Sequence, residues 1–257
     1  MRRLFVIGIG AGSPKHVTLE GVEAIGASDV FFVIDKGSTA PELRALRAEL
    51  IERHAASGTP RIVAIPEAER DRQPGDYEGA VADWHRERAA RVASAITAEL
   101  DEDGTGAFLV WGDPSLYDST LRLLDRVRET GPVEFETVVV PGVSSVQALA
   151  ARHLLPLHGV GEPVLITTGR RLATDLATGI PNIVVMLDGQ EAFAQIDGDG
   201  LDIHWGAYLG TPAEITIAGP LPEVAEHIVT TRRAAREKHG WIMDIYLLRR
   251  RSHPDPT

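Results

Sequence analysis

The sequence has no cysteine, no long apolar run and no excess of basic charge, and each absence excludes a class of protein. Without cysteine there is no disulfide framework, thiol nucleophile or cysteine-ligated metal. No stretch approaches the roughly 20 apolar residues that a membrane-spanning helix needs. Gly8, Gly10 and Gly12 interrupt the first apolar run too early for a signal peptide, so we expect a cytoplasmic protein without a membrane partner.

The charge balance is acidic, with a formal net charge of −11 at pH 7. A general nucleic-acid binder needs a basic surface to contact phosphates, so no nucleic-acid partner is expected. A polyanionic substrate would need a local basic pocket that works against the overall field. The histidines are scattered without the spacing of metal ligands, so no metal site is expected either.

The first half alternates short apolar runs with helical patterns, which is typical of βα units around a parallel sheet. Strands are predicted at residues 4–9, 30–34, 62–65, 107–111 and 133–140. Leu19, Val22 and Ile25 recur on one face and predict the first helix. Further helices are predicted from the same kind of pattern at residues 41–50, 81–100, 116–127 and 144–153. The polar residues 67–76 are predicted to form an exposed loop.

The second half has more strands per helix, which indicates a mixed sheet. Residues 155–163 contain two prolines and two glycines and are typical of a linker. A helix is predicted at residues 221–228, and strands are predicted at residues 164–167, 183–187, 205–209, 214–218 and 241–248. The expected fold is therefore two α/β domains, at residues 1–157 and 158–257.

Three segments at predicted strand ends are rich in turn-forming residues: 8–14, 112–114 and 141–145. Ligands of open α/β sheets bind beyond the carboxyl ends of the strands, and glycine lets a ligand approach the backbone. Each segment alone is commonly just a tight turn. Three of them on one sheet edge favour a nucleoside-containing cofactor.

The first segment does not fit the dinucleotide fingerprint Gly-x-Gly-x-x-Gly, because the third position holds Ser13 or Lys15, depending on the register. Pro14 also delays the helix that would face a pyrophosphate. The commoner Rossmann-like methyltransferases usually end this strand on an acidic residue, where this chain has Ile7. A nucleotide-binding module and an NAD-dependent oxidoreductase remain as alternatives.

The three segments resemble, in order, the motifs of the tetrapyrrole methylases. Residues 6–14 (VIGIGAGSP), 109–117 (LVWGDPSLY) and 139–145 (VVPGVSS) are similar to the first three motifs, and residues 184–186 and 209–214 to the later ones. Two positions depart from the family pattern: Ala11 stands where most members have proline, and Ser13 where most have aspartate. A carboxylate at position 13 is therefore no part of the mechanism.

This resemblance implies two α/β domains with S-adenosylmethionine in the cleft between them, S-adenosylhomocysteine as a product, and a homodimer. It implies cofactor contacts at Gly10, Ala11, Gly112, Asp113, Leu116, Ser144, Ser145, Met186, Leu187 and Gly210. Residues 31–37, 83–85, 185–189 and 210–214 resemble the members that methylate ring carbon C-1 of a corrin precursor and release acetate in cobalamin biosynthesis. Members that methylate another precorrin or uroporphyrinogen share the cofactor motifs, so these activities remain as alternatives for this chain.

Methyl transfer from a sulfonium is an in-line displacement with a neutral leaving group, so alignment alone can supply much of the acceleration. The candidate catalytic residues are Asp113, Tyr117 and Asp35, each near a strand end. Each has a structural alternative: an Asx-type turn for Asp113, a core aromatic for Tyr117, and a salt bridge for Asp35. Asp188, like Asp35, is either a functional carboxylate at a strand end or the partner in a salt bridge.

Arg170 and Arg171 follow a predicted strand end in the second half. A corrin precursor carries many carboxylates, and the forked guanidinium group suits them. We therefore expect these arginines to bind substrate, with solvated surface residues as the alternative.

Overall fold

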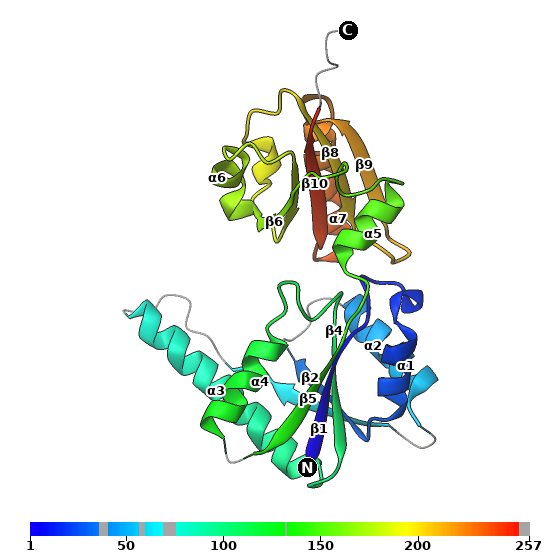
Figure 1. Ribbon diagram of the computed structural model, residues 1–257, viewed down its shortest axis with the longest axis vertical. Coiled ribbons are helices and arrows are strands. Elements are labelled where there is room, and N and C mark those ends of the chain that lie inside the picture. Colours follow the sequence, from blue (N-terminus) through cyan, green and yellow to red (C-terminus); the bar gives the residue numbers. More distant parts are fainter. Residues whose placement is uncertain (36–40, 57–59, 69–75, 132, 252–257) are drawn as a thin grey trace. The chain divides into compact units, whose positions relative to one another are not determined.

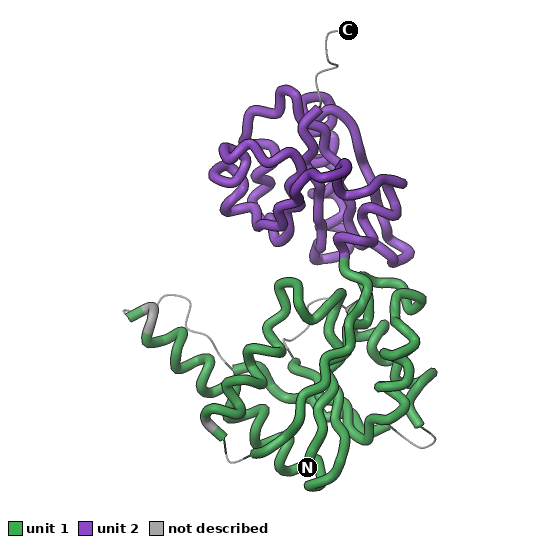
Figure 2. The backbone as a smooth tube through the Cα atoms, viewed as in Figure 1, with its two compact units in different colours: residues 1–144 green, residues 145–257 purple. Residues whose placement is uncertain are grey.

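The computed structural model describes residues 1–35, 41–56, 60–68, 76–131 and 133–251. These residues form two compact units, residues 1–144 and 145–257, which are described separately (Figure 2). The division falls earlier than the boundary expected after residue 157. Helix α5 (Ser145–Arg152) belongs to unit 2 because it packs against the strands of that unit.

Unit 1 contains a five-stranded parallel sheet with the order β3-β2-β4-β1-β5. All five strands were predicted from their apolar runs: β1 (Arg2–Gly8), β2 (Val30–Asp35), β3 (Arg61–Pro66), β4 (Thr105–Val110) and β5 (Phe135–Val140). Their carboxyl ends meet at one edge of the sheet, because every neighbouring pair is parallel. That edge carries the three glycine-rich segments.

Helices cover both faces of this sheet (Figure 1). Helices α1 (Leu19–Gly26) and α2 (Pro41–His54) bury Ile25 and Leu50 against one face. Helices α3 (Tyr77–Glu99) and α4 (Thr120–Thr130) bury Ile96 and Leu124 against the other. Strands covered on both faces need apolar side chains at nearly every position, which explains their continuous apolar runs.

Two details of unit 1 differ from the predictions. Leu19 is 83% exposed, and the buried face of α1 is formed by Gly21, Ala24 and Ile25 instead. Leu116 lies before α4, which begins at Thr120. The predicted loop at residues 67–76 falls mostly on residues 69–75, which lie outside the described residues.

Unit 2 contains the predicted mixed sheet, with the order β6-β7-β10-β8-β9. Its strands are β6 (Val164–Thr168), β7 (Asn182–Met186), β8 (Leu201–Ala207), β9 (Ile215–Pro220) and β10 (Asp244–Arg250). Only β6 and β7 pair in parallel, and the other neighbours are antiparallel. The fully buried Trp205, Phe193 and Tyr246 lie in its core.

The helices of unit 2 besides α5 are α6 (Leu172–Leu176), which was not predicted, and α7 (Leu221–His239). Short 3-10 helices are η1 (Pro14–His16) in unit 1 and η2 (Gly169–Arg171) and η3 (Ala192–Ala194) in unit 2. Within the described residues, no helix is long and apolar enough to cross a bilayer.

Candidate functional site

A two-way backbone bridge joins the loops that follow β1 and β4. Gly10 N donates to Gly112 O at 3.2 Å, and Gly112 N donates to Gly10 O at 2.8 Å. Both glycines have positive φ angles, 86° and 70°, which favour a residue without a side chain. The first two glycine-rich segments are therefore held together by their own backbones.

The loop after β5 packs against both of them. A Cβ at Gly142 would lie 2.3 Å from Gly112 O and 2.6 Å from Gly8 C. A Cβ at Gly8 would lie 2.6 Å from Gly142 N. Three backbone segments meet here at a distance that only glycine permits, which confirms that the three segments share one sheet edge.

Asp113 holds the second and third loops together. Its Oδ1 accepts hydrogen bonds from the backbone N of Ser115, at 2.9 Å, and from the Ser115 hydroxyl, while its Oδ2 accepts from Gly142 N at 2.9 Å. Burial opposes ionisation of Asp113, but the bonds from Ser115 and Gly142 outweigh it and hold its pKa below the usual 3.8. The Asx-type turn is confirmed, and Asp113 is an ionised carboxylate that fixes the loops.

The other two candidate catalytic residues of unit 1 lie near the same edge. Tyr117 precedes α4 with a φ angle of 52° and is 44% exposed, so both the core position and the placement in the first helical turn are wrong. Asp35, at the end of β2, forms a 2.8 Å ion pair with Arg44 of α2. The salt-bridge interpretation of Asp35 is confirmed.

In unit 2, three of the predicted cofactor residues, Met186, Leu187 and Gly210, also share one sheet edge. Strands β7 and β8 both run antiparallel to β10, and there Met186 lies opposite Ile245 and Ala207 opposite Asp244. Met186 and Leu187, at the end of β7, therefore lie on the same edge as Gly210, which follows β8. Thr168 pairs with Met186, so η2 begins at that edge too.

The backbone at this edge is strained. Leu187, Glu191 and Tyr208 are non-glycine residues with φ angles of 54°, 56° and 50°. Left-handed conformations of this kind gather at ligand sites and need support from their surroundings. Leu187 is also 65% exposed, unusual for a leucine beside a core strand.

A buried arginine that sequence reasoning missed supplies much of that support. Arg232 of α7 donates from its two Nη atoms to Asp188 O at 2.9 Å and to Glu191 Oε1 at 3.2 Å, and from Nε to Asp244 Oδ2 at 2.9 Å. Burial opposes its charge, but Asp244 and Glu191 outweigh burial and raise the pKa of Arg232. Arg232 thus clamps both ends of the segment 188–191.

Asp188 completes the support from inside the same segment. Its carboxylate accepts from Gln190 N at 3.1 Å, Ala192 N at 2.7 Å and the Tyr246 hydroxyl at 2.7 Å. Its side chain is 5% exposed and forms hydrogen bonds in place of the salt bridge that was considered for it. Asp188 is therefore a fixed structural carboxylate.

The two arginines predicted to bind substrate lie in η2. Arg171 forms a 3.0 Å ion pair with the largely buried Asp175, and Arg170 is exposed. The structure places both near the carboxyl end of β6, but within the described part of the chain only Arg171 has a carboxylate partner.

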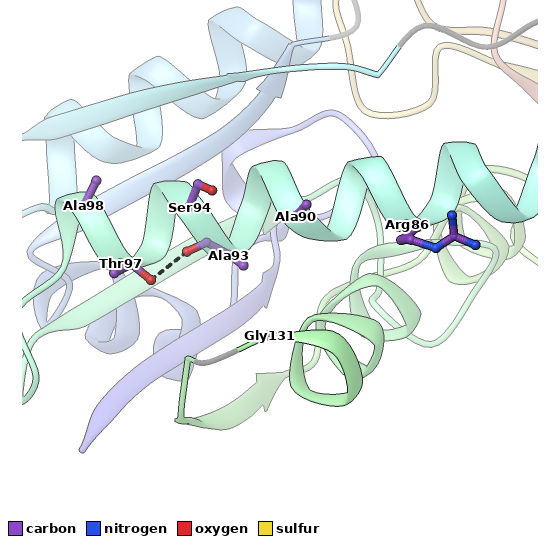
Figure 3. A pocket seen from close by; sticks show the side chains of 7 residues that line it. All are labelled: Arg86, Ala90, Ala93, Ser94, Thr97, Ala98 and Gly131. Carbon is purple, nitrogen blue, oxygen red and sulfur yellow. Dashed lines mark hydrogen bonds between the residues drawn. The ribbon is translucent and has the colours of Figure 1, made fainter.

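A separate hollow of about 630 Å³ lies along α3 and reaches Gly131, beyond the end of α4 (Figure 3). The hydrogen bond from Thr97 Oγ1 to Ala93 O, at 2.9 Å, lies in its lining. Arg86 is the one charged side chain among its seven lining residues, and the rest are small. Its polar side chains are Arg86, Ser94 and Thr97, and none of its lining residues belongs to the glycine loops.

The family model for the tetrapyrrole (corrin/porphyrin) methylases matches residues 3–225, which include every loop described above. The chain belongs to this family. This tetrapyrrole methylase is 46% identical over 250 residues to a precorrin-6A synthase (deacetylating) from Sinorhizobium, and the match covers 97% of this chain and 96% of that protein.

Two solved structures agree with the fold of this methylase. A protein described as cobalamin synthesis related (CobF), from Corynebacterium diphtheriae, has a TM-score of 0.86 and 38% identity, over 98% of this chain and all of that one. A uroporphyrin-III C-methyltransferase from Thermus thermophilus, solved with S-adenosylhomocysteine, has a TM-score of 0.57 and 20% identity, over 96% and 91% of the two chains. This methylase is an S-adenosylmethionine-dependent methyltransferase of cobalamin biosynthesis.

Proposed function

We propose that this methylase transfers a methyl group from S-adenosylmethionine to ring carbon C-1 of precorrin-5 and that the product loses its acetyl group as acetate, giving precorrin-6A. The observation that carries the proposal is the 46% identity to a precorrin-6A synthase, which extends over nearly the full length of both chains. The match covers 97% of this chain and 96% of that protein, so the likeness is not restricted to a cofactor motif.

Cofactor binding is proposed for loops of each unit. In unit 1 these are the bridged loops, with Gly10, Ala11, Gly112, Asp113, Leu116 and Ser144. In unit 2 they are Ser145 and the strained strand ends, with Met186, Leu187 and Gly210. Ala11 and Ser144 are almost fully buried, at 2% exposed each, so Ala11 is expected to contact the cofactor through its backbone.

The chemistry fits a site that is rigid rather than acid–base active. An in-line transfer requires the sulfonium methyl group and the nucleophilic ring carbon to be aligned, and preformed loops reduce the entropic cost of that alignment. Loss of acetate requires water, or an equivalent nucleophile, at the acetyl carbonyl carbon. Asp113 or Asp35 is proposed to orient that water as a hydrogen-bond acceptor.

Calorimetric titration tests the cofactor assignment. The protein should bind S-adenosylhomocysteine saturably and should not bind NAD. Saturable NAD binding without S-adenosylhomocysteine binding would favour the oxidoreductase alternative. Binding without methyl transfer to any tetrapyrrole would favour a non-catalytic nucleotide-binding module.

We also propose that the enzyme works as a homodimer in the cytoplasm. The family resemblance supports the dimer, and the absence of cysteine supports a reducing compartment. Light scattering coupled to size exclusion should give twice the mass of the 27.8 kDa chain. A monomer at micromolar concentration would contradict the dimer.

A further inference from the structure

Strands β2 and β4 are neighbours in the sheet of unit 1, but the chain leaves them toward opposite faces. Helix α2 follows β2 on one face, and α4 follows β4 on the other (Figure 1). Such a reversal is a topological switch point, where the carboxyl ends of the strands leave a crevice for ligands. The two strands pair only at their beginnings, Val30 with Gly106 and Phe31 with Ala107, so they separate toward that end.

Arg47 of α2 extends to β4 where β2 has separated from it. Its Nε donates to Leu109 O at 2.9 Å, one residue before the end of β4. Arg47 thus gives the Leu109 carbonyl a hydrogen-bond donor near the point where β4 no longer pairs with β2. Because this bond uses Nε, it fixes the plane of the guanidinium group and leaves the two Nη groups as donors.

The charge of Arg47 is not neutralised by an ion pair. Among the described residues, no carboxylate lies within ion-pair distance of it, whereas Asp35 nearby is paired with Arg44. Burial lowers the pKa of Arg47, and Asp118 acts against that effect from farther away. A half-buried arginine whose two Nη groups donate to no described residue is well suited to bind an oxyanion.

We propose that Arg47 binds a side-chain carboxylate of the tetrapyrrole substrate at the carboxyl ends of β2 and β4, an inference that rests on the proposed function. An acidic chain with a net charge of −11 needs such local cations to bind a polycarboxylate. Arg47 is better placed for this than Arg171, which already pairs with Asp175. Asp118 opposes the binding because its negative charge lies near the same guanidinium group.

The test uses uroporphyrin, a porphyrin with acetate and propionate side chains, as the probe, and follows its fluorescence during titration. Arg47→Gln should weaken uroporphyrin binding about tenfold, as expected for one lost charge-assisted bond, without a change in S-adenosylhomocysteine affinity. The matched control is Arg53→Gln, on the same helix, where Arg53 forms an exposed ion pair with Glu49. That control should bind uroporphyrin as the unmodified protein does.

A second variant changes the affinity in the other direction and leaves Arg47 intact. Asp118 Oδ1 accepts from Thr120 N at 2.7 Å, and an asparagine oxygen can accept the same bond. Asp118→Asn should therefore keep the start of α4 and tighten uroporphyrin binding. The inference would be overturned if Arg47→Gln and Asp118→Asn both bound uroporphyrin as the unmodified protein does. It would also be overturned if Arg53→Gln weakened uroporphyrin binding as much as Arg47→Gln. If the unmodified protein does not bind S-adenosylhomocysteine, the proposed function fails, and the Arg47 result still decides the carboxylate site.

Discussion

The contact of three backbones at the glycine loops predicts that Gly142→Ala is severely damaging. The added Cβ would lie 2.3 Å from Gly112 O, roughly 1 Å short of ordinary van der Waals contact. The neighbours at Gly8 and Gly112 are backbone atoms, which cannot rotate away, so the loops must separate. Overpacking of this kind costs about 1–3 kcal/mol, and we expect the upper end of that range.

The separation should also weaken cofactor binding, because loops misplaced by about 1 Å no longer present their backbone groups to one ligand. Urea unfolding followed by circular dichroism measures the stability, and calorimetry with S-adenosylhomocysteine measures the affinity. The matched control is Gly189→Ala, because a Cβ there meets nothing within 4 Å and the φ angle is not positive. Gly142→Ala with the stability and affinity of the unmodified protein would show that close contact of the three backbones is not required.

Three further variants test the clamp, the loop carboxylate and the exposed arginines. Arg232→Met should destabilise unit 2 by about 3–5 kcal/mol in urea unfolding, because it leaves the buried Asp244 without its cation, and a smaller loss would contradict the clamp. Although burial opposes it, hydrogen bonds keep the pKa of Asp113 below 3.8, so its stabilising contribution is present at neutral pH and is lost as the pH falls through that lowered pKa. Asp113→Asn should accordingly lose less stability than the unmodified protein below about pH 4 in acid titrations, and parallel curves would count against it. Replacing Arg170 and Arg171 together with glutamine should raise the apparent KM for the tetrapyrrole and leave S-adenosylhomocysteine affinity unchanged. An unchanged KM, or a loss of affinity for both the tetrapyrrole and S-adenosylhomocysteine, would count against a role in substrate binding.

The strands and the loop cluster of unit 1 were predictable because local chemistry specifies them. Strands buried on both faces need unbroken apolar runs, and parallel pairing then brings every carboxyl end to one edge. The start of α4 was not predictable from periodicity, because Tyr117 has a φ angle of 52° and the Asp118 side chain accepts a hydrogen bond from Thr120 N, so the helix begins at Thr120 and leaves out Leu116. The side chain of Thr18 accepts a hydrogen bond from Gly21 N and caps α1, so Leu19 is the first residue of the helix. The buried face of the helix begins two residues later, at Gly21.

The supporting polar residues were hidden because their partners are distant in the sequence. Arg232 is 44 residues from Asp188 and 41 from Glu191, and Arg47 is 62 from Leu109. No spacing rule connects such pairs, and each arginine lies on a helix where a solvated surface position is the usual interpretation. Only the folded topology brings them to the strand ends.

Methyl transfer to precorrin-5 and loss of acetate can be measured together in one experiment. The enzyme is incubated with precorrin-5 and methyl-labelled S-adenosylmethionine, and the label in the tetrapyrrole and the free acetate are measured in the same sample. We expect label and acetate in equal amounts. Label without acetate would assign the chain to another reaction of the family, and neither product from a protein that binds S-adenosylhomocysteine normally would contradict precorrin-5 as the substrate.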